Sequence, residues 1–131
     1  MSPAETVQRF IDQINVHDVD GLSVLLTPDH RFIDSLGSVA VGRETMREGW
    51  RQYFQMVPDY HIEITQSFTD GGEVALLGSA GGTYARNMQM KPADAWQTPA
   101  AWHAVVRDGL IAEWQVYADN EPIRQRMRQP A

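Results

Sequence analysis

Apolar residues in the first part of the chain recur at intervals of three and four positions, which is the spacing of an amphipathic helix. The spacing predicts a helix over residues 3–16, a short second helix that ends before Pro28, and a third helix over residues 43–57 that Pro58 ends. Between the second and third helices, loose alternation around Gly37 indicates a short hairpin. Three helices therefore open the chain.

Two of the helix starts carry local capping signals. Ser2, followed by Pro3 and then by Glu5, has the spacing of a capping box with proline at the first helical position. Asp18 or Asp20 can cap the second helix through a side-chain oxygen. Both signals agree with the starts that the apolar pattern predicts.

From Tyr60 onward the apolar period changes to two, which is typical of strands. Two long hairpins are predicted, turning at residues 70–72 and 108–109, because Asp-Gly pairs favour tight turns. The segment between the hairpins, residues 86–97, is polar and is expected to be a loop. A curved antiparallel sheet after three helices, with a short helix at the end of the chain, predicts one α+β domain over residues 1–131.

Composition and charge narrow the class of partner. The chain is 43% hydrophobic and 21% charged, as globular proteins are, and its 17 acidic and 11 basic side chains give a net charge of −6. Nucleic-acid binding needs a concentrated cationic face, so a small molecule is the expected partner. No cysteine occurs, and no run approaches the roughly 18 apolar residues of a membrane helix. We expect a cytoplasmic protein that does not bind membranes.

Two stretches of the chain carry a resemblance to a known superfamily: FIDSLGSVAVGRE, residues 32–44, and the final strand pattern over residues 107–122. They resemble the nuclear transport factor 2-like superfamily, and more narrowly its SnoaL-like polyketide cyclase and ketosteroid isomerase branches. The resemblance implies a cone-shaped fold in which a bent sheet wraps around the helices and leaves an apolar cavity. It also implies proton-transfer chemistry without a cofactor, and a homodimer formed through the sheet.

Asp34 is the first candidate for that chemistry, because it matches the general base of the isomerase. By strand parity it shares a face with Phe32, so its carboxylate is expected to point toward the core, where desolvation would raise its pKa. Alternatively, Asp34 only caps the turn that follows it, or Arg43 or Arg47 reaches it and forms an ion pair. His30 lies on the same face and is a second candidate acid or base.

The parity set by the resemblance also predicts an aromatic cavity wall, with His103 and Tyr117 facing outward. The expected lining residues are Phe10, Phe32, Trp50, Phe54, Trp102, Trp114 and Ala118. Such a wall suits a flat, apolar ligand with indole N–H groups as polar contacts; the alternative is plain core packing. The polar loop between the hairpins is expected to close the cavity mouth with Met88, Met90 or Trp96.

Several positions depart from the machinery of the two branches. Phe10, Trp50 and Trp102 stand where the isomerase has hydrogen-bond donors, and phenylalanine donates none. Ala118 stands where the cyclases have an acid–base aspartate, with Asp119 one residue late and so expected on the opposite face. Steroid isomerisation itself is therefore not expected.

Two hypotheses from different classes follow. The first is a cofactor-independent isomerase, cyclase or dehydratase in which Asp34 moves a proton on an apolar carbonyl-containing substrate. The second is a non-catalytic ligand-binding or structural dimeric module of the same fold. A metal site is not expected, because His61 and Glu63 share a strand face but have no third ligand in register.

Overall fold

The computed structural model describes residues 1–129, in which helices and strands follow one another as the sequence pattern predicts. The elements are α1 (Pro3–Asn15), α2 (Val19–Ser23), β1 (Leu26–Ile33), β2 (Val39–Val41), α3 (Arg43–Met56), β3 (His61–Asp70), β4 (Glu73–Arg86), β5 (Gln89–Arg107), β6 (Leu110–Ala118) and α4 (Glu121–Arg128). No helix among these is long and apolar enough to cross a membrane.

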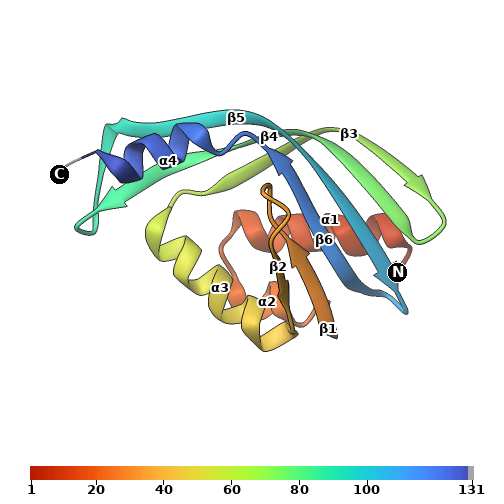
Figure 1. Cartoon of the computed structure of the whole chain (residues 1–131). Helices are drawn as coiled ribbons and strands as arrows, with labels where there is room; N and C mark the ends of the chain where they lie inside the picture. The colour runs from red at the N-terminus through yellow and green to blue at the C-terminus, as the bar shows by residue number, and fades with distance from the viewer. Residues whose placement is uncertain (130–131) are drawn as a thin grey trace.

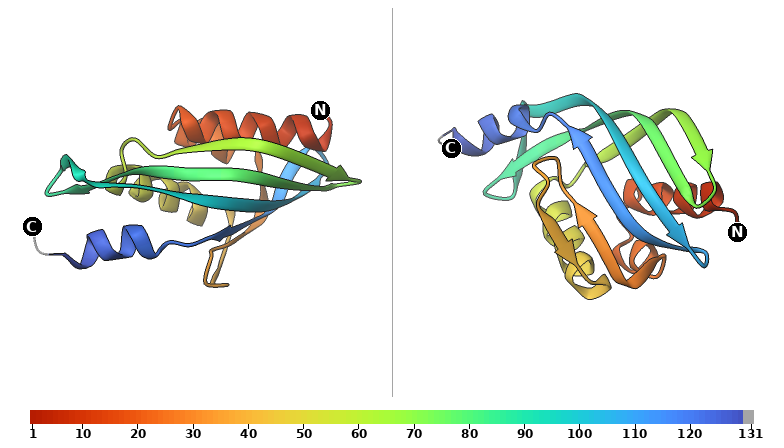
Figure 2. Two further views of the ribbon diagram at one scale, coloured as in Figure 1. Left: turned by 90° about the horizontal axis from the view of Figure 1, so that it is seen from above. Right: turned by 45° about the vertical axis from the view of Figure 1, so that its right-hand side comes forward.

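The strands form one bent sheet in the order β2-β1-β6-β5-β4-β3. The sheet curves around α1 and α3, while α4 lies beside the β4–β5 hairpin (Figures 1 and 2). Neighbouring strands are antiparallel except β1 and β6, which are parallel. The α+β fold with a curved sheet is confirmed, and the sheet is mixed because β1 pairs with the last strand. Local hairpin signals say nothing about such a distant partner.

The predicted helix starts are confirmed. Ser2 accepts a hydrogen bond from the backbone N–H of Glu5, whose side chain accepts one from the backbone of Ser2, and Asp18 caps α2. Pro28, however, does not end a helix: it lies inside β1, which begins at Leu26. The β1–β6 pairing is irregular across this stretch, where proline has no N–H to donate to a ladder.

The loop expected between the two long hairpins is instead a continuation of β4 and β5. The chain reverses at Asn87 and Met88, whose φ angles of 49° and 63° are those of a tight hairpin turn. Met88 is 97% exposed and contributes nothing to closing the cavity. Along β5, Asp94 and Trp96 are buried and Ala95 is exposed, so the segment alternates as a strand does.

The predicted register of the last hairpin is confirmed. Trp102 and Trp114 are buried on the inner face of the sheet, where their rings lie 6.4 Å apart. On the outer face, His103 Nε2 lies 2.8 Å from Glu73 Oε1, and Tyr117 is 54% exposed. The inner face of the sheet therefore presents indole rings to α1 and α3.

A glycine in β4 allows the sheet to bend. Gly78 pairs with Ile64, next to an irregularity in the β3–β4 register. A Cβ atom at Gly78 would lie 1.8 Å from the carbonyl oxygen of Glu63, which is closer than any real contact. The backbones therefore approach here at a distance that only glycine permits.

We expect Gly78→Ala to lower the free energy of unfolding by about 2 kcal/mol or more, because the strands must move apart. Gly49→Ala is the matched control: its Cβ would make ordinary contacts with Met46 in α3, and alanine favours helices, so stability should hold or rise. Urea unfolding measures both values. Equal stability of the two variants would contradict the close approach at Gly78.

Candidate functional site

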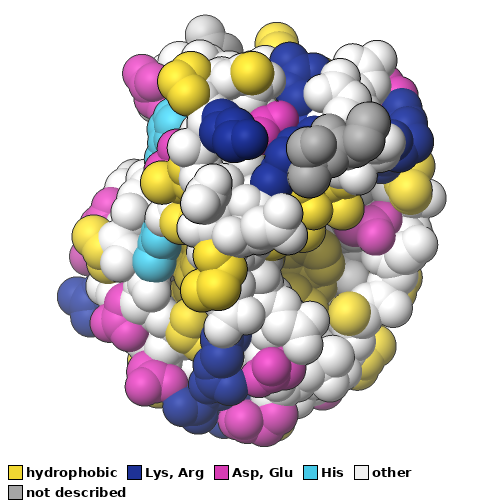
Figure 3. Space-filling model, turned by 90° about the vertical axis from the view of Figure 1, so that its left-hand side faces the viewer, with side chains coloured by type: hydrophobic (Ala, Val, Ile, Leu, Met, Phe, Trp, Pro, Cys, Tyr) yellow, Lys and Arg dark blue, Asp and Glu magenta, His cyan; other side chains and the backbone are white. Residues whose placement is uncertain are grey.

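A cavity of ≈ 410 Å³ lies between α3, the inner face of the sheet and the β1–β2 turn. In Figure 3 its mouth is a hollow in the surface with hydrophobic side chains at its floor. Of the seven residues predicted to line it, the structure places five there: Phe32, Trp50, Trp102, Trp114 and Ala118. The candidate base Asp34 lines it as well. The cavity wall is largely aromatic, as the parity argument predicts.

Phe10 and Phe54 do not line the cavity. Phe10 is fully buried behind the wall, where it packs edge-on against Trp50 and Trp114. Phe54 lies one turn further along α3 than Trp50, with ring centroids 5.5 Å apart, and its ring stacks on His17 at 4.3 Å. Phe10 therefore supports the lining rings, and Phe54 belongs to the packing between α3 and the α1–α2 connection.

Asp34 follows β1 directly and contributes to both the turn and the cavity. Its Oδ1 accepts hydrogen bonds from the backbone N–H groups of Leu36 at 2.9 Å and Ser38 at 3.0 Å. Its second oxygen, Oδ2, accepts none from residues 1–129, and the half-buried side chain lines the cavity. Asp34 therefore caps its turn through Oδ1 and also lines the cavity, with Oδ2 left without a partner among the described residues.

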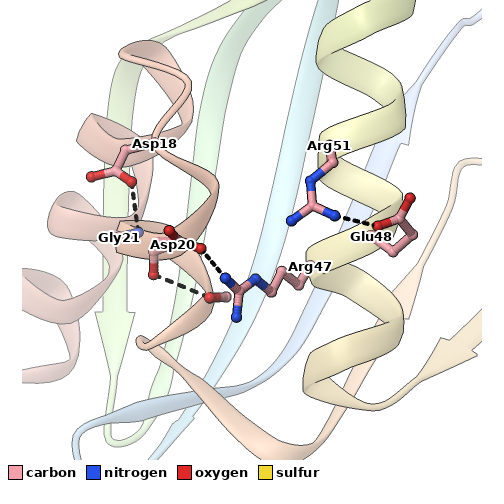
Figure 4. Close-up of polar contacts among 7 residues, drawn as sticks. Asp18, Asp20, Gly21, Arg47, Glu48 and Arg51 are labelled. Carbon is pink, nitrogen blue, oxygen red and sulfur yellow. Dashed lines mark hydrogen bonds and ion pairs between the residues drawn. The ribbon is translucent and has the colours of Figure 1, made fainter.

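Neither arginine of α3 that could have neutralised Asp34 does so. The Arg43 guanidinium donates two hydrogen bonds to the carbonyl oxygen of Leu26, at 2.9 and 2.6 Å. Arg47 pairs with Asp20 of α2, on the side of α3 that faces α2 (Figure 4). Within the described residues Asp34 has no ion-pair partner, so its free oxygen stays available to a ligand.

Two tyrosines that the sequence analysis did not assign to the site also line the cavity, Tyr53 of α3 and Tyr60 before β3. Their rings lie 4.9 Å apart at 88°. Burial raises the pKa of both phenols, so both are neutral at physiological pH. Neither hydroxyl is hydrogen-bonded to another described residue, although tyrosine hydroxyls in interiors usually have a partner. The pair therefore offers two donors to a ligand.

Trp96 and Asn120 also line the cavity. The loop prediction is wrong for Trp96, which reaches the cavity from β5. The other buried residues on its face of the strand, Asp94 and Thr98, are polar, so no apolar alternation in the sequence indicated a strand here. Asn120 donates a hydrogen bond of 2.7 Å from Nδ2 to Ser35 Oγ, which ties the start of α4 to the β1–β2 turn. No periodicity in the sequence indicated that contact.

His30 is buried in the core and does not line the cavity. Its Nδ1 lies 2.7 Å from the carbonyl oxygen of Ile111, which can only accept, so Nδ1 carries the proton. Its Nε2 is buried without a partner in residues 1–129. Burial is the main effect on this ring and lowers its pKa, which keeps it neutral. His30 joins β1 to β6 and does not face a ligand.

Asp119, expected on the face opposite the cavity, does not line it and instead accepts a 2.9 Å hydrogen bond from the backbone N–H of Glu121 at the start of α4. Within residues 1–129, no group of three His, Asp or Glu side chains is arranged to hold a metal ion. Asp34 is thus the one carboxylate that the described structure brings to the cavity.

A protein-family model for the SnoaL-like domain matches residues 7–114. The chain belongs to the SnoaL-like domain family. That match includes β1 with its Asp34 turn, α3 and most of the sheet, so the cavity lies almost entirely within the shared domain. No curated protein matches the SnoaL-like chain.

Solved structures share the fold over nearly the whole length. A ketosteroid isomerase-like protein from Catenulispora acidiphila in complex with trimethylamine is 21% identical, with a TM-score of 0.80 over 99% of this chain and 96% of that one. Proteins described as SnoaL-like polyketide cyclases from Shewanella denitrificans and Jannaschia are 14% and 19% identical, both with TM-scores of 0.82. They cover 96% and 98% of this chain, and 96% and 93% of their own. At these identities the likeness establishes a common fold.

The buried imidazole of His30 predicts acid sensitivity. Its pKa is lower in the folded chain than the ordinary 6.5, so below about pH 6.5 the unfolded chain binds a proton that the folded chain does not. Stability should be full above pH 6.5 and fall as the pH decreases, by up to about 1.4 kcal/mol per pH unit. Urea unfolding between pH 8 and 5 measures this slope.

His30→Gln should flatten that slope, whatever its effect on stability at pH 8. His61→Gln is the control, because His61 is exposed on β3 and its loss should leave the slope as it is. An unchanged slope in His30→Gln would show that other groups cause the acid sensitivity.

Proposed function

We propose that this SnoaL-like protein binds a largely apolar, carbonyl-containing small molecule and moves a proton on it without a cofactor, as an isomerase, cyclase or dehydratase does. The observation that carries the proposal is the free carboxylate oxygen of Asp34 at the wall of an aromatic cavity. A general base needs such an oxygen within reach of the substrate. The trimethylamine complex of the Catenulispora protein is consistent with small-molecule binding by this fold.

The chemistry begins at a C–H bond next to the carbonyl group. The bond breaks, its proton passes to Asp34, and its electron pair moves onto the carbonyl oxygen as an enolate. Hydrogen-bond donors that meet this oxygen lower the barrier. Tyr53 and Tyr60 supply neutral hydroxyls of this kind, whereas Phe10 donates none and Trp50 and Trp102 offer only indole N–H groups. Return of the proton from Asp34 to another carbon completes an isomerisation.

A second candidate function is a non-catalytic ligand-binding or structural module, and one observation favours it. His30, the other acid or base expected beside Asp34, is sealed in the core and does not line the cavity. Asp34 also stabilises its turn through two hydrogen bonds, so an aspartate at this position has a structural role even in a protein without catalytic activity.

We propose that the protein is cytoplasmic, as its sequence predicts. We also propose that it forms a homodimer through the outer face of the sheet. Leu77 pairs with Ala101, and Ala101 with Tyr117, so their side chains form one row across three strands. Leu77 is 42% and Phe68 58% exposed, which makes this face less polar than a solvent-facing sheet usually is.

Exchange of carbon-bound protons for deuterium tests the catalytic proposal without knowledge of the natural substrate. A panel of cyclic and aromatic ketones in D₂O, followed by NMR, should include compounds whose α-protons exchange faster with the protein than without it. Asp34→Asn should reduce that exchange by about 100-fold or more, because the amide cannot accept the proton. The amide oxygen can still hold the turn.

Asp119→Asn is the matched control and should leave the exchange rate unchanged, because Asp119 lies outside the cavity. Full exchange activity in Asp34→Asn would eliminate Asp34 as the base. Binding of the ketones without any accelerated exchange would support the non-catalytic module.

Light scattering at micromolar concentration tests the dimer. We expect about twice the chain mass of 14.8 kDa for the wild type, and the monomer mass for Leu77→Glu, which places a charge in the apolar row. Val24→Glu, at an exposed apolar position away from the sheet, should remain dimeric. A monomeric wild type would refute the proposed interface.

A further inference from the structure

Four of the cavity-lining rings contact one another and form a cluster, here called the aromatic box: Trp50, Tyr53, Tyr60 and Trp96. They come from three separate parts of the chain: α3, the residue just before β3, and β5. The centroid of Tyr60 lies 4.9 Å from that of Tyr53, 6.4 Å from that of Trp50 and 6.3 Å from that of Trp96. The ring of Tyr53 stands nearly perpendicular to those of Tyr60 and Trp50. The wall therefore presents ring faces as well as ring edges.

The charge on the cavity wall is of one sign, negative. Among the described residues that line it, Asp34 is the one formally charged side chain. The nearest guanidinium groups of α3 are held elsewhere, Arg43 by a backbone carbonyl and Arg47 by Asp20. A carboxylate and aromatic faces are both electronegative, and nothing cationic lines the cavity to balance them. The cavity therefore favours a ligand that carries a positive charge.

We propose that the ligand of this cavity carries an alkylated ammonium group, tertiary or quaternary, held in the aromatic box. The inference rests on the proposed function only in placing the ligand in the same cavity. The negative face of an indole or phenol ring attracts a cation, most strongly when water is excluded. A partly buried carboxylate without a partner attracts the same charge.

The chemistry of the wall favours an alkylated ammonium over a primary one. A primary ammonium donates three hydrogen bonds and is strongly hydrated, so it needs several acceptors. The box offers two indole N–H groups, which only donate, and two phenol oxygens, which are fewer acceptors than the three that a primary ammonium needs. The indole N–H groups of Trp50 and Trp96 have no partner among residues 1–129. Hydroxyls lie at the ring edges, so they can donate to a ligand oxygen while the ring faces contact the methyl groups of the cation.

The test compares three small molecules of nearly the same shape and different charge: choline, 3,3-dimethylbutan-1-ol and 3,3-dimethylbutanoate. We expect NMR titration of the wild-type protein to show choline binding at least tenfold more tightly than the neutral alcohol, with the carboxylate weakest. The anion is included because Lys and Arg side chains lie around the hollow in Figure 3. Equal or tighter binding of either other probe, or no binding of choline, overturns the proposal.

Matched variants locate the preference within the cavity. Tyr53→Leu should lower the choline-to-alcohol affinity ratio at least threefold, whereas Tyr53→Phe keeps the ring and should keep the ratio. Tyr84→Leu is the control, because Tyr84 lies outside the cavity with the guanidinium of Arg86 already over its ring. Asp34→Asn removes the negative charge of the carboxylate and should also lower the choline-to-alcohol affinity ratio. This variant provides the test if Tyr53→Leu does not fold. An unchanged ratio in both variants contradicts the proposed site.

The outcomes separate this inference from the proposed function. Ketones that bind and exchange their α-protons, together with no preference for choline, would overturn the ammonium inference alone. A clear preference for choline with no exchange on any ketone would overturn the catalytic proposal and leave the ammonium site in place.

Discussion

Phe10 of α1 packs edge-on against Trp114 of β6, with centroids 4.9 Å apart, and against Trp50 of α3 at 6.2 Å. This double contact joins the sheet and α3, the two walls of the cavity, through one fully buried ring. Rigid aromatic side chains in edge-to-face contact cannot collapse into the space beside them without losing that geometry. The open volume in front of Trp50 and Trp114 depends on this support from behind.

Asp34, the carboxylate that lines the cavity, is also held in place by its surroundings. Asp34 is held by the two N–H groups of its own turn, and the turn is tied by Ser35 to Asn120 at the start of α4. A carboxylate fixed through one oxygen has the other in a defined position, which suits either a proton transfer or the binding of a cation. Both proposals made for the cavity therefore depend on the local geometry of one turn.

Local patterns in the sequence predicted much of this arrangement correctly. The capping box at Ser2, the stripe that places Trp50 on the buried face of α3, and the parity of Trp102 and Trp114 all follow from interactions between residues close in the chain. The misassignment of residues 86–97 to a loop has the same origin. That segment is polar because residues 87–93 are exposed on both faces, and its strand structure comes from pairing with β4.

The sequence by itself determined the helices, the alternation of the strands and the presence of Asp34 next to an aromatic face, because each depends on spacing along the chain. Only the tertiary structure decided which of these residues share the cavity. In the folded chain, Phe10 packs behind the cavity wall against Trp114, and His30 is buried with its Nδ1 hydrogen-bonded to the carbonyl oxygen of Ile111. The tertiary structure also brought Tyr53, Tyr60 and Trp96 together from three parts of the chain. Contacts of that kind depend on how the sheet bends and which strands pair, and no short-range pattern encodes either of them.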